Sequence, residues 1–113
     1  MIVQLRRKSA RYTDLSPQQH YAVIGIEADD YRILNDQGRP YVYPRRLFEV
    51  VDPREPEDWV IERGDDGERY AYPSLLNAPG FFEDFFDAKQ EAVAIFWQVV
   101  NRRLAAAEVD SPS

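Results

Sequence analysis

The chain has 113 residues, of which 44% are hydrophobic, enough for one ordinary domain with a single buried core. It contains no cysteine, which excludes disulfides, thiolate nucleophiles and cysteine-bound zinc and fits a reducing compartment. The apolar start of the sequence stops at Arg6, too early for a signal peptide or a membrane span. We therefore expect a cytoplasmic protein that does not enter a membrane.

The net charge of −6 is unevenly distributed along the chain. Residues 1–52 carry eight Lys or Arg against seven Asp or Glu, whereas residues 53–113 carry six against thirteen. An acidic second half repels nucleic acid phosphates and favours a basic partner, although acidic surfaces often serve only solubility.

The first 52 residues predict short strands separated by turn signals. The first strand is expected at 2–7, and a polar loop at 9–19 leads into a second strand at 20–28. Alternation places Tyr21 and Val23 on one face of that strand. Ala22, Ile24 and Ile26 fall on the other, so both faces are expected to be covered.

Two further turns divide the rest of this region. Asp29-Asp30 is expected to be a minimal turn, and Gly38 can take the positive φ that closes a hairpin after Asp36-Gln37. The return strand "PYVYP" carries Tyr41 and Tyr43 on one face. One 3₁₀ turn over 44–47 and a last strand, "FEVVD", complete the region at residue 52.

This order of elements, with the stretch "YPRRLFEVV", resembles that of SH3-like barrels and covers residues 2–52. The resemblance implies a small five-stranded barrel and says little about function. The whole chain is also similar to small bacterial proteins of uncharacterised function that combine "VIGIE", "LFEVVD" and "GFFEDFFD".

The second half, residues 53–113, is predicted as an acidic connector, a hairpin and a helix. Residues 59–62 can pair with 69–72 across "RGDDG", but whether residues 59–72 form this hairpin and whether Trp59 is core or surface both stay open. Asp87 and Gln90 form a capping-box pattern that predicts a helix over about 87–107. Its apolar stripe consists of Val93, Phe96, Trp97, Val100 and Leu104.

A small barrel and a lone amphipathic helix each lack cover, so we expect the helix to pack on the barrel. The phenylalanines of "GFFEDFF" would add to that contact, with Phe81 and Phe85, or Phe82 and Phe86, sharing a face of a helical turn. The predicted fold is α+β, with a barrel at 1–52 and an extension at 53–113 forming one cooperative unit.

No catalytic, cofactor or metal signature stands out. His20, the single histidine, has no partner in a recognisable motif, and Asp65-Asp66-Gly67-Glu68 lacks the ligand spacing of an EF-hand. The glycines are too scattered for a phosphate loop. We therefore expect no enzyme, no cofactor and no metal ion.

Nucleic acid binding is an alternative, because small barrels often bind nucleic acids. Arg6, Arg7, Lys8 and Arg11 cluster in sequence near Tyr12. The acidic second half counts against this function, since it places repulsive charge within one or two Debye lengths of a bound strand.

Binding of another protein is the favoured function. An SH3-like peptide groove could use Tyr12, Tyr41 or Tyr43 and Pro44, but the tryptophan typical of such grooves is missing at Tyr31. Aromatic anchors and acidic charge suit a folded, basic partner, and the hypothesis is an immunity-type inhibitor of a basic toxin. An uncharacterised adaptor is the other alternative; partner identity and oligomeric state stay open. The expected partner-binding residues are Tyr12, Tyr41, Tyr43, Glu55, Glu57, Asp58, Asp65, Asp66 and Glu68.

Overall fold

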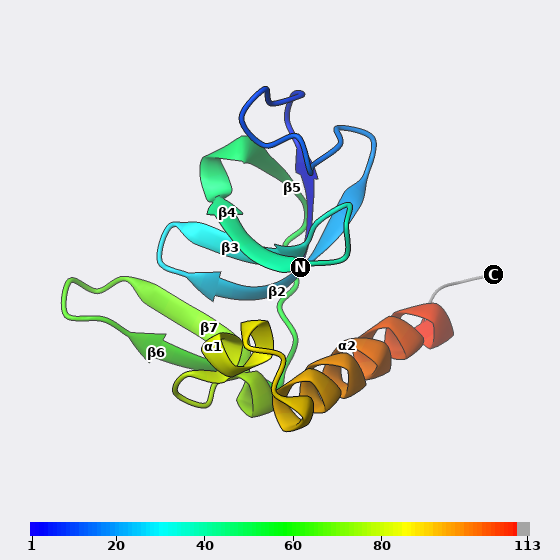
Figure 1. The fold of residues 1–113 in the computed structure, drawn as a ribbon. Helices are drawn as coiled ribbons and strands as arrows, with labels where there is room; N and C mark the ends of the chain where they lie inside the picture. Colours follow the sequence, from blue (N-terminus) through cyan, green and yellow to red (C-terminus); the bar gives the residue numbers. More distant parts are fainter. Residues whose placement is uncertain (111–113) are drawn as a thin grey trace. The chain divides into compact units, whose positions relative to one another are not determined.

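The computed structural model describes the backbone of residues 1–110 and the side chains of residues 1–103. Within them the chain is α+β and divides into two compact units, Met1–Pro73 and a second that begins at Ser74 (Figure 1). The first unit holds the strands, and the second holds the helices.

All strand pairs of the first unit are antiparallel, and one path joins five of them in the order β4-β3-β2-β1-β5. A hairpin of two more strands attaches to this path, because β7 pairs with both β6 and β2. The strands are β1 (Ile2–Leu5), β2 (His20–Glu27), β3 (Asp30–Leu34), β4 (Pro40–Pro44), β5 (Phe48–Asp52), β6 (Trp59–Arg63) and β7 (Arg69–Pro73).

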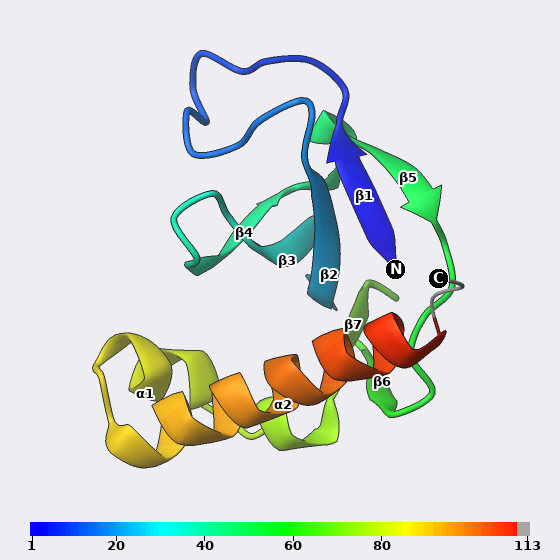
Figure 2. The same ribbon diagram turned by 90° about the vertical axis from the view of Figure 1, so that its right-hand side faces the viewer.

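The five strands expected in residues 2–52 are confirmed, but they do not form a barrel closed by hydrogen bonds. β4 and β5 lie at opposite ends of the path, joined in sequence by the 3₁₀ turn η1 (Arg45–Leu47), and no pairing within residues 1–110 links them. The sheet curls, with the β1–β5 pair turned away from the β3–β4 pair (Figure 2). The predicted α+β fold with a five-stranded antiparallel sheet is thus confirmed, whereas hydrogen bonds do not close that sheet into a barrel.

β2 is the central strand, and both of its edges are occupied. β3 pairs with β2 between Val23 and Glu27, so β7, which pairs with the same Ile26 and Glu27, must lie on the opposite edge. β1 pairs with the first residues of β2, at His20 to Ala22. The predicted hairpin over 59–72 is therefore confirmed, and it extends the sheet beyond residue 52.

A β-bulge changes which side chains of β2 face the core. Val23 pairs with Ile33 and Gly25 with Arg32, so one extra residue lies on β2. As a result Tyr21, Val23 and Ile26 all join one core cluster, while Ala22 is exposed. The prediction that Ile26 shares a face with Ala22 is wrong, because the bulge reverses the alternation.

The core of the first unit draws on every strand. Its most buried members include Val3, Val23 and Ile33, and Trp59 is 7% exposed. The open question of whether Trp59 is core or surface is thus answered. Its indole Nε1 is buried and has no hydrogen-bond partner in the described residues, an arrangement that costs stability.

Two turns depend on residues with positive φ. Gly38 has φ 74° and its N–H donates to the carbonyl of Asn35 at 2.9 Å, as predicted for this hairpin. The turn between β2 and β3 lies one residue earlier than predicted, at Ala28 and Asp29, since Glu27 pairs with Asp30. Ala28 has φ 55°, a strained conformation for a residue with a Cβ.

The second unit contains a 3₁₀ turn η2 (Ser74–Leu76), α1 (Phe81–Phe86) and α2 (Gln90–Asp110). The helix predicted from Asp87 begins at Gln90 instead. Asp87 is the C-cap of α1, where its N–H donates to Glu83 and Phe85, and Ala88 at φ 58° separates the two helices. The predicted capping box is therefore wrong.

Phenylalanines hold these two helices together. Phe85 lies against Phe96 with ring centroids 4.6 Å apart, Phe82 contacts Phe96 at 6.1 Å, and Phe96 is fully buried. Trp97, expected in the apolar stripe, is 38% exposed, and Leu104 lies outside the described side chains. Packing of α2 on the sheet and a single cooperative unit stay predictions.

We predict that Ala28→Gly stabilises the protein and Gly38→Ala destabilises it. Glycine at residue 28 relieves the positive-φ strain and gains up to about 1 kcal/mol after the entropy of the unfolded chain is counted. Alanine at residue 38 adds the same strain without a steric clash, at a cost of about 1 kcal/mol. Urea unfolding measures both changes in stability. Destabilisation by Ala28→Gly together with stabilisation by Gly38→Ala would contradict the role of positive φ.

Candidate functional site

The tip of the β6–β7 hairpin displays two carboxylates. The turn closes through the Gly64 N–H, which donates to the Glu68 carbonyl at 2.8 Å, and through Gly67 at φ 81°. The Glu68 carboxylate accepts the Asp66 N–H at 3.0 Å, so it holds the turn. Asp65 and Asp66 are both exposed, and their side chains face solvent at the end of the hairpin.

Gly64 leaves the space that this turn needs. A Cβ on Gly64 would lie 1.7 Å from a carboxylate oxygen of Glu68. Because that distance is impossible for real atoms, glycine at this position lets the Glu68 side chain lie across the turn. Predicted site residue Glu68 is thus mainly a structural part of the acidic tip.

Glu55, another predicted site residue, is neutralised by Arg69. The Arg69 guanidinium donates to both carboxylate oxygens of Glu55, and both side chains are partly buried. These hydrogen bonds lower the pKa of Glu55 below its ordinary value. The pair fixes the connector against the start of β7 and leaves Glu55 little charge to offer a partner.

Glu57 and Asp58 are exposed and immediately precede β6. The same segment also carries Glu62, Asp65 and Asp66, and two aliphatic side chains of β6 are exposed, Val60 with an exposed fraction of 37% and Ile61 with 50%. Residues 53–68 carry seven Asp or Glu and two Arg. Three of the six predicted acidic residues, Asp65, Asp66 and Glu68, therefore lie on the hairpin, and Glu57 and Asp58 immediately precede it.

The three predicted tyrosines lie apart from that hairpin and differ in accessibility. Tyr43 is 3% exposed, and its hydroxyl donates to Asp14 at 2.7 Å. Tyr12 is half-buried, with its ring edge-on to Tyr43 at 5.6 Å. Tyr41 is 42% exposed. Tyr43 thus belongs to the core, and Tyr12 and Tyr41 present ring surface to solvent.

Asp14 and Asp36 attach the long loop to the β3–β4 turn. The Asp36 N–H donates to the Asp14 carbonyl at 2.9 Å, and the amide of Asn35 donates to the Asp14 carboxylate at 3.1 Å. Burial and the hydrogen bond to Asp14 raise the pKa of Tyr43 above its ordinary value. These hydrogen bonds hold the long loop against the β3–β4 turn, and peptide binding beside it stays a prediction.

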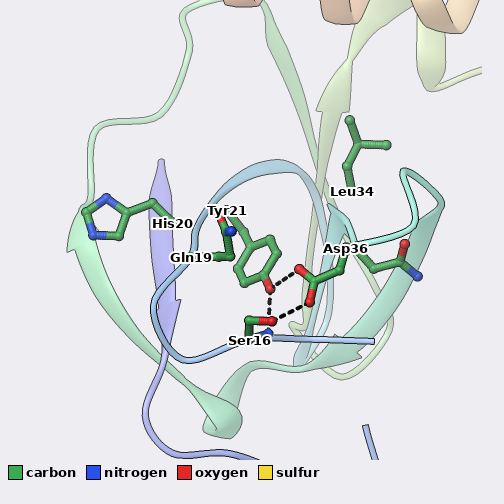
Figure 3. Close-up of a pocket in the computed structure, with 7 residues that line it drawn as sticks. Ser16, Gln19, His20, Tyr21, Leu34 and Asp36 are labelled. Carbon is green, nitrogen blue, oxygen red and sulfur yellow. Dashed lines mark hydrogen bonds between the residues drawn. The ribbon is translucent and has the colours of Figure 1, made fainter. Parts of the chain in front are cut away.

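A polar pocket of about 500 Å³ lies at the other side of the same loop (Figure 3). The hydroxyls of Tyr21 and Ser16 each donate to one oxygen of Asp36 at 2.6 Å, and the Ser16 N–H donates to Tyr21 Oη at 2.7 Å. Burial, followed by the hydrogen bond to Asp36, raises the pKa of Tyr21 to about 12. His20 lines this pocket but points away from the hydrogen-bonded group (Figure 3).

Sequence reasoning missed a buried charged cluster at the centre of the sheet. Arg32 is 7% exposed and donates to Tyr72 Oη at 2.7 Å, to the Pro40 carbonyl at 2.6 Å and to Glu27 at 3.0 Å. Tyr72 Oη donates to the same Glu27 oxygen at 2.6 Å. An arginine in an alternating strand pattern gives no local signal that a distant strand will cover it.

The basic residues of the nucleic acid alternative are partly engaged in contacts of their own. Arg6 Nε donates to the Phe48 carbonyl at 3.0 Å, and the guanidinium of Arg11 lies 5.5 Å from the Tyr12 ring centroid. Arg7 and Lys8 are exposed. Nothing in these contacts aligns the four side chains along a phosphate backbone.

Metal sites and membrane-spanning helices are both absent from the part of the chain that the structure describes. No cluster of three or more Asp, Glu or His side chains there is arranged to hold a metal ion. None of its helices has a stretch long and apolar enough to cross a bilayer.

Comparisons with known proteins add no functional assignment. No protein-family model matches this chain, and comparisons with curated proteins and with solved structures gave no significant match. The residues themselves must therefore carry any functional argument.

We predict that Arg32→Met destabilises the protein by about 3 kcal/mol, because it leaves Glu27 and the Tyr72 hydroxyl without their buried partner. The matched control is Arg54→Met, which removes the exposed pair that Arg54 forms with Asp52 and is expected to destabilise the protein far less, because solvent screens that pair. Chemical denaturation measures both, and equal effects would argue against a structural role for the buried pair.

We also predict that stability falls as the pH rises above about 10. The folded state keeps the protons of Tyr21, Tyr43 and Tyr72, whose pKa values are raised, whereas the unfolded chain loses its tyrosine protons near pH 10. Stability that is fully present below pH 10 is therefore lost progressively toward pH 12. Urea unfolding should show a shallower alkaline decline for Tyr21→Phe, and an unchanged decline would contradict the assignment.

Proposed function

We propose that this chain is a non-catalytic protein-binding module that uses the β6–β7 hairpin to bind a basic protein. The observation that carries it is the two exposed carboxylates of Asp65 and Asp66, which form no ion pair within the described residues, on a hairpin that also exposes Val60 and Ile61. Apolar side chains supply contact area, and the carboxylates steer a partner of opposite charge.

A stable scaffold behind the hairpin supports this proposal. Ala71 of β7 is fully buried and pairs with both Ile26 and Ile61, so the hairpin is joined to the central strand. The Ala28 N–H donates to the Arg69 carbonyl at 2.8 Å at the same junction. A binding element held in this way loses little conformational freedom when a partner binds.

The more specific version of the proposal is an immunity-type inhibitor. A small acidic protein of this kind would occlude the positively charged cleft of a toxin such as a nuclease, where the hairpin tip would take the place of substrate phosphates. The element order of residues 2–52 also supports an SH3-like arrangement for the sheet, although that fold admits many functions.

The test is differential capture from the native cell with three tagged baits: the unchanged protein, Asp65→Lys with Asp66→Lys, and Arg7→Glu with Lys8→Glu. We expect a basic protein that the unchanged bait and the Arg7/Lys8 bait retain and the tip variant loses. Because the attraction is electrostatic, capture should weaken as salt rises from about 0.05 M to about 0.5 M.

Two outcomes would overturn the proposal. Equal capture by all three baits would show that the hairpin charges play no part. Loss of capture by the Arg7/Lys8 bait alone, with nucleic acid in the retained material, would instead support the nucleic acid alternative. For the inhibitor version, the captured protein must be toxic when expressed alone and harmless when expressed with this chain.

A further inference from the structure

The outer edge of β6 has backbone groups that no strand pairs with in the described residues. β6 has one neighbouring strand, β7, with the regular register Trp59 to Pro73 through Arg63 to Arg69. The Gly64 N–H donates to the Glu68 carbonyl, which marks a hydrogen-bonded pair at the turn. In an antiparallel ladder such pairs alternate, so Glu62 and Val60 direct their backbone groups toward β7.

The pairing of β7 with β2 independently shows which backbone groups of β6 point outward. The Arg69 carbonyl accepts from the Ala28 N–H, so Arg69 and Ala71 direct their backbone groups toward β2. Their partners across β6, Arg63 and Ile61, must then point outward. Within the described residues, the backbone N–H and C=O of Ile61 and Arg63 have no protein partner, whereas the Trp59 N–H donates to Pro56.

The edge of β6 lacks features that protect the other two edges of the sheet. β4 has a proline at each end, and the pairing of β5 with β1 contains an irregularity in its register. β6 contains neither proline nor lysine and its ladder has no bulge. Its four residues from Val60 to Arg63 are all exposed.

Charge decides what can occupy this edge. A second copy of the hairpin would bring Asp58, Glu62 and the tip carboxylates against themselves, which disfavours edge-to-edge self-association. A basic strand would instead be attracted by these carboxylates. Glu62 shares a face with Val60, and Ile61 shares the other face with Arg63. An added strand would therefore place lysine beside Glu62 and an aliphatic residue beside Ile61.

We propose that an extended basic segment of the partner pairs with β6 as an additional strand, bonded to the backbone groups of Ile61 and Arg63. This inference rests on the proposed function and names its binding mode. Backbone hydrogen bonds supply affinity that tolerates sequence variation, and the alternating side chains supply selectivity.

The direct probe is a synthetic nine-residue peptide that alternates lysine with valine, added to ¹⁵N-labelled protein. We expect slowed amide exchange and chemical-shift changes at Ile61 and Arg63, and little change in exchange at Val60 and Glu62, whose N–H groups already bond to β7. A peptide that alternates glutamate with valine is the control and should leave all four unchanged. Slowed exchange confined to other strands, or none, would overturn the proposal.

Ile61→Pro tests the backbone contact while sparing the fold. The Ile61 N–H faces outward, so its loss removes no bond to β7, and proline is tolerated at such edge positions. We expect native far-ultraviolet circular dichroism and about tenfold weaker peptide binding, the effect of losing roughly one net hydrogen bond. Arg63→Pro, at the next outward position, serves if Ile61→Pro fails to fold. Unchanged affinity in a folded variant would overturn the proposal.

Failure of this inference can be separated from failure of the proposed function. If the Asp65/Asp66 bait loses the captured protein while a folded Ile61→Pro bait retains it fully, the hairpin binds by surface contact alone and strand addition is wrong. If light scattering shows a dimer that Ile61→Pro converts to a monomer, the edge is occupied by a second copy and the basic-segment proposal is overturned.

Discussion

The pairing of β2 on both of its edges is the constraint on which the rest of the sheet depends. Seven of the eight residues of this strand pair with β1, β3 or β7, and the last two of them pair on both sides at once. The bulge near Gly25 shifts the alternation of side chains, so Tyr21, Val23 and Ile26 all lie in the same core. Gly25 also leaves room for the Tyr72 ring, which would lie 2.2 Å from a Cβ at that position.

Local signals in the sequence predicted much of the fold, and long-range pairings account for the main errors. Gly38 and the "RGDDG" turn indicate hairpins because each chain reversal is determined within a few residues. The attachment of β7 to β2 joins residues more than forty positions apart, and no local pattern encodes it. The capping-box error has a local cause. Asp87 is the C-cap of α1, so it is not the N-cap of α2.

The clustering of acidic residues in the candidate site was predictable from the sequence, whereas the burial of Tyr43 was not. Acidic residues concentrated in one segment of the sequence come together because a hairpin holds them. Tyr43 was expected to bind a partner, yet its hydroxyl donates to Asp14, and the hydroxyls of Tyr21 and Tyr72 likewise donate to Asp36 and Glu27. The amino-acid composition gives the numbers of tyrosines and carboxylates, but it does not show that they hydrogen-bond to one another.

This internal pairing narrows where a partner can bind. A carboxylate that pairs with an arginine, as Glu55 does with Arg69, contributes little net charge to an outer electrostatic field. Asp65 and Asp66 are not used in that way, and they sit at the end of a strand whose outer backbone groups are also unused. The exposed carboxylates of Asp65 and Asp66 and the outward-facing backbone groups of β6 thus lie on one hairpin. An extended basic segment would bind both.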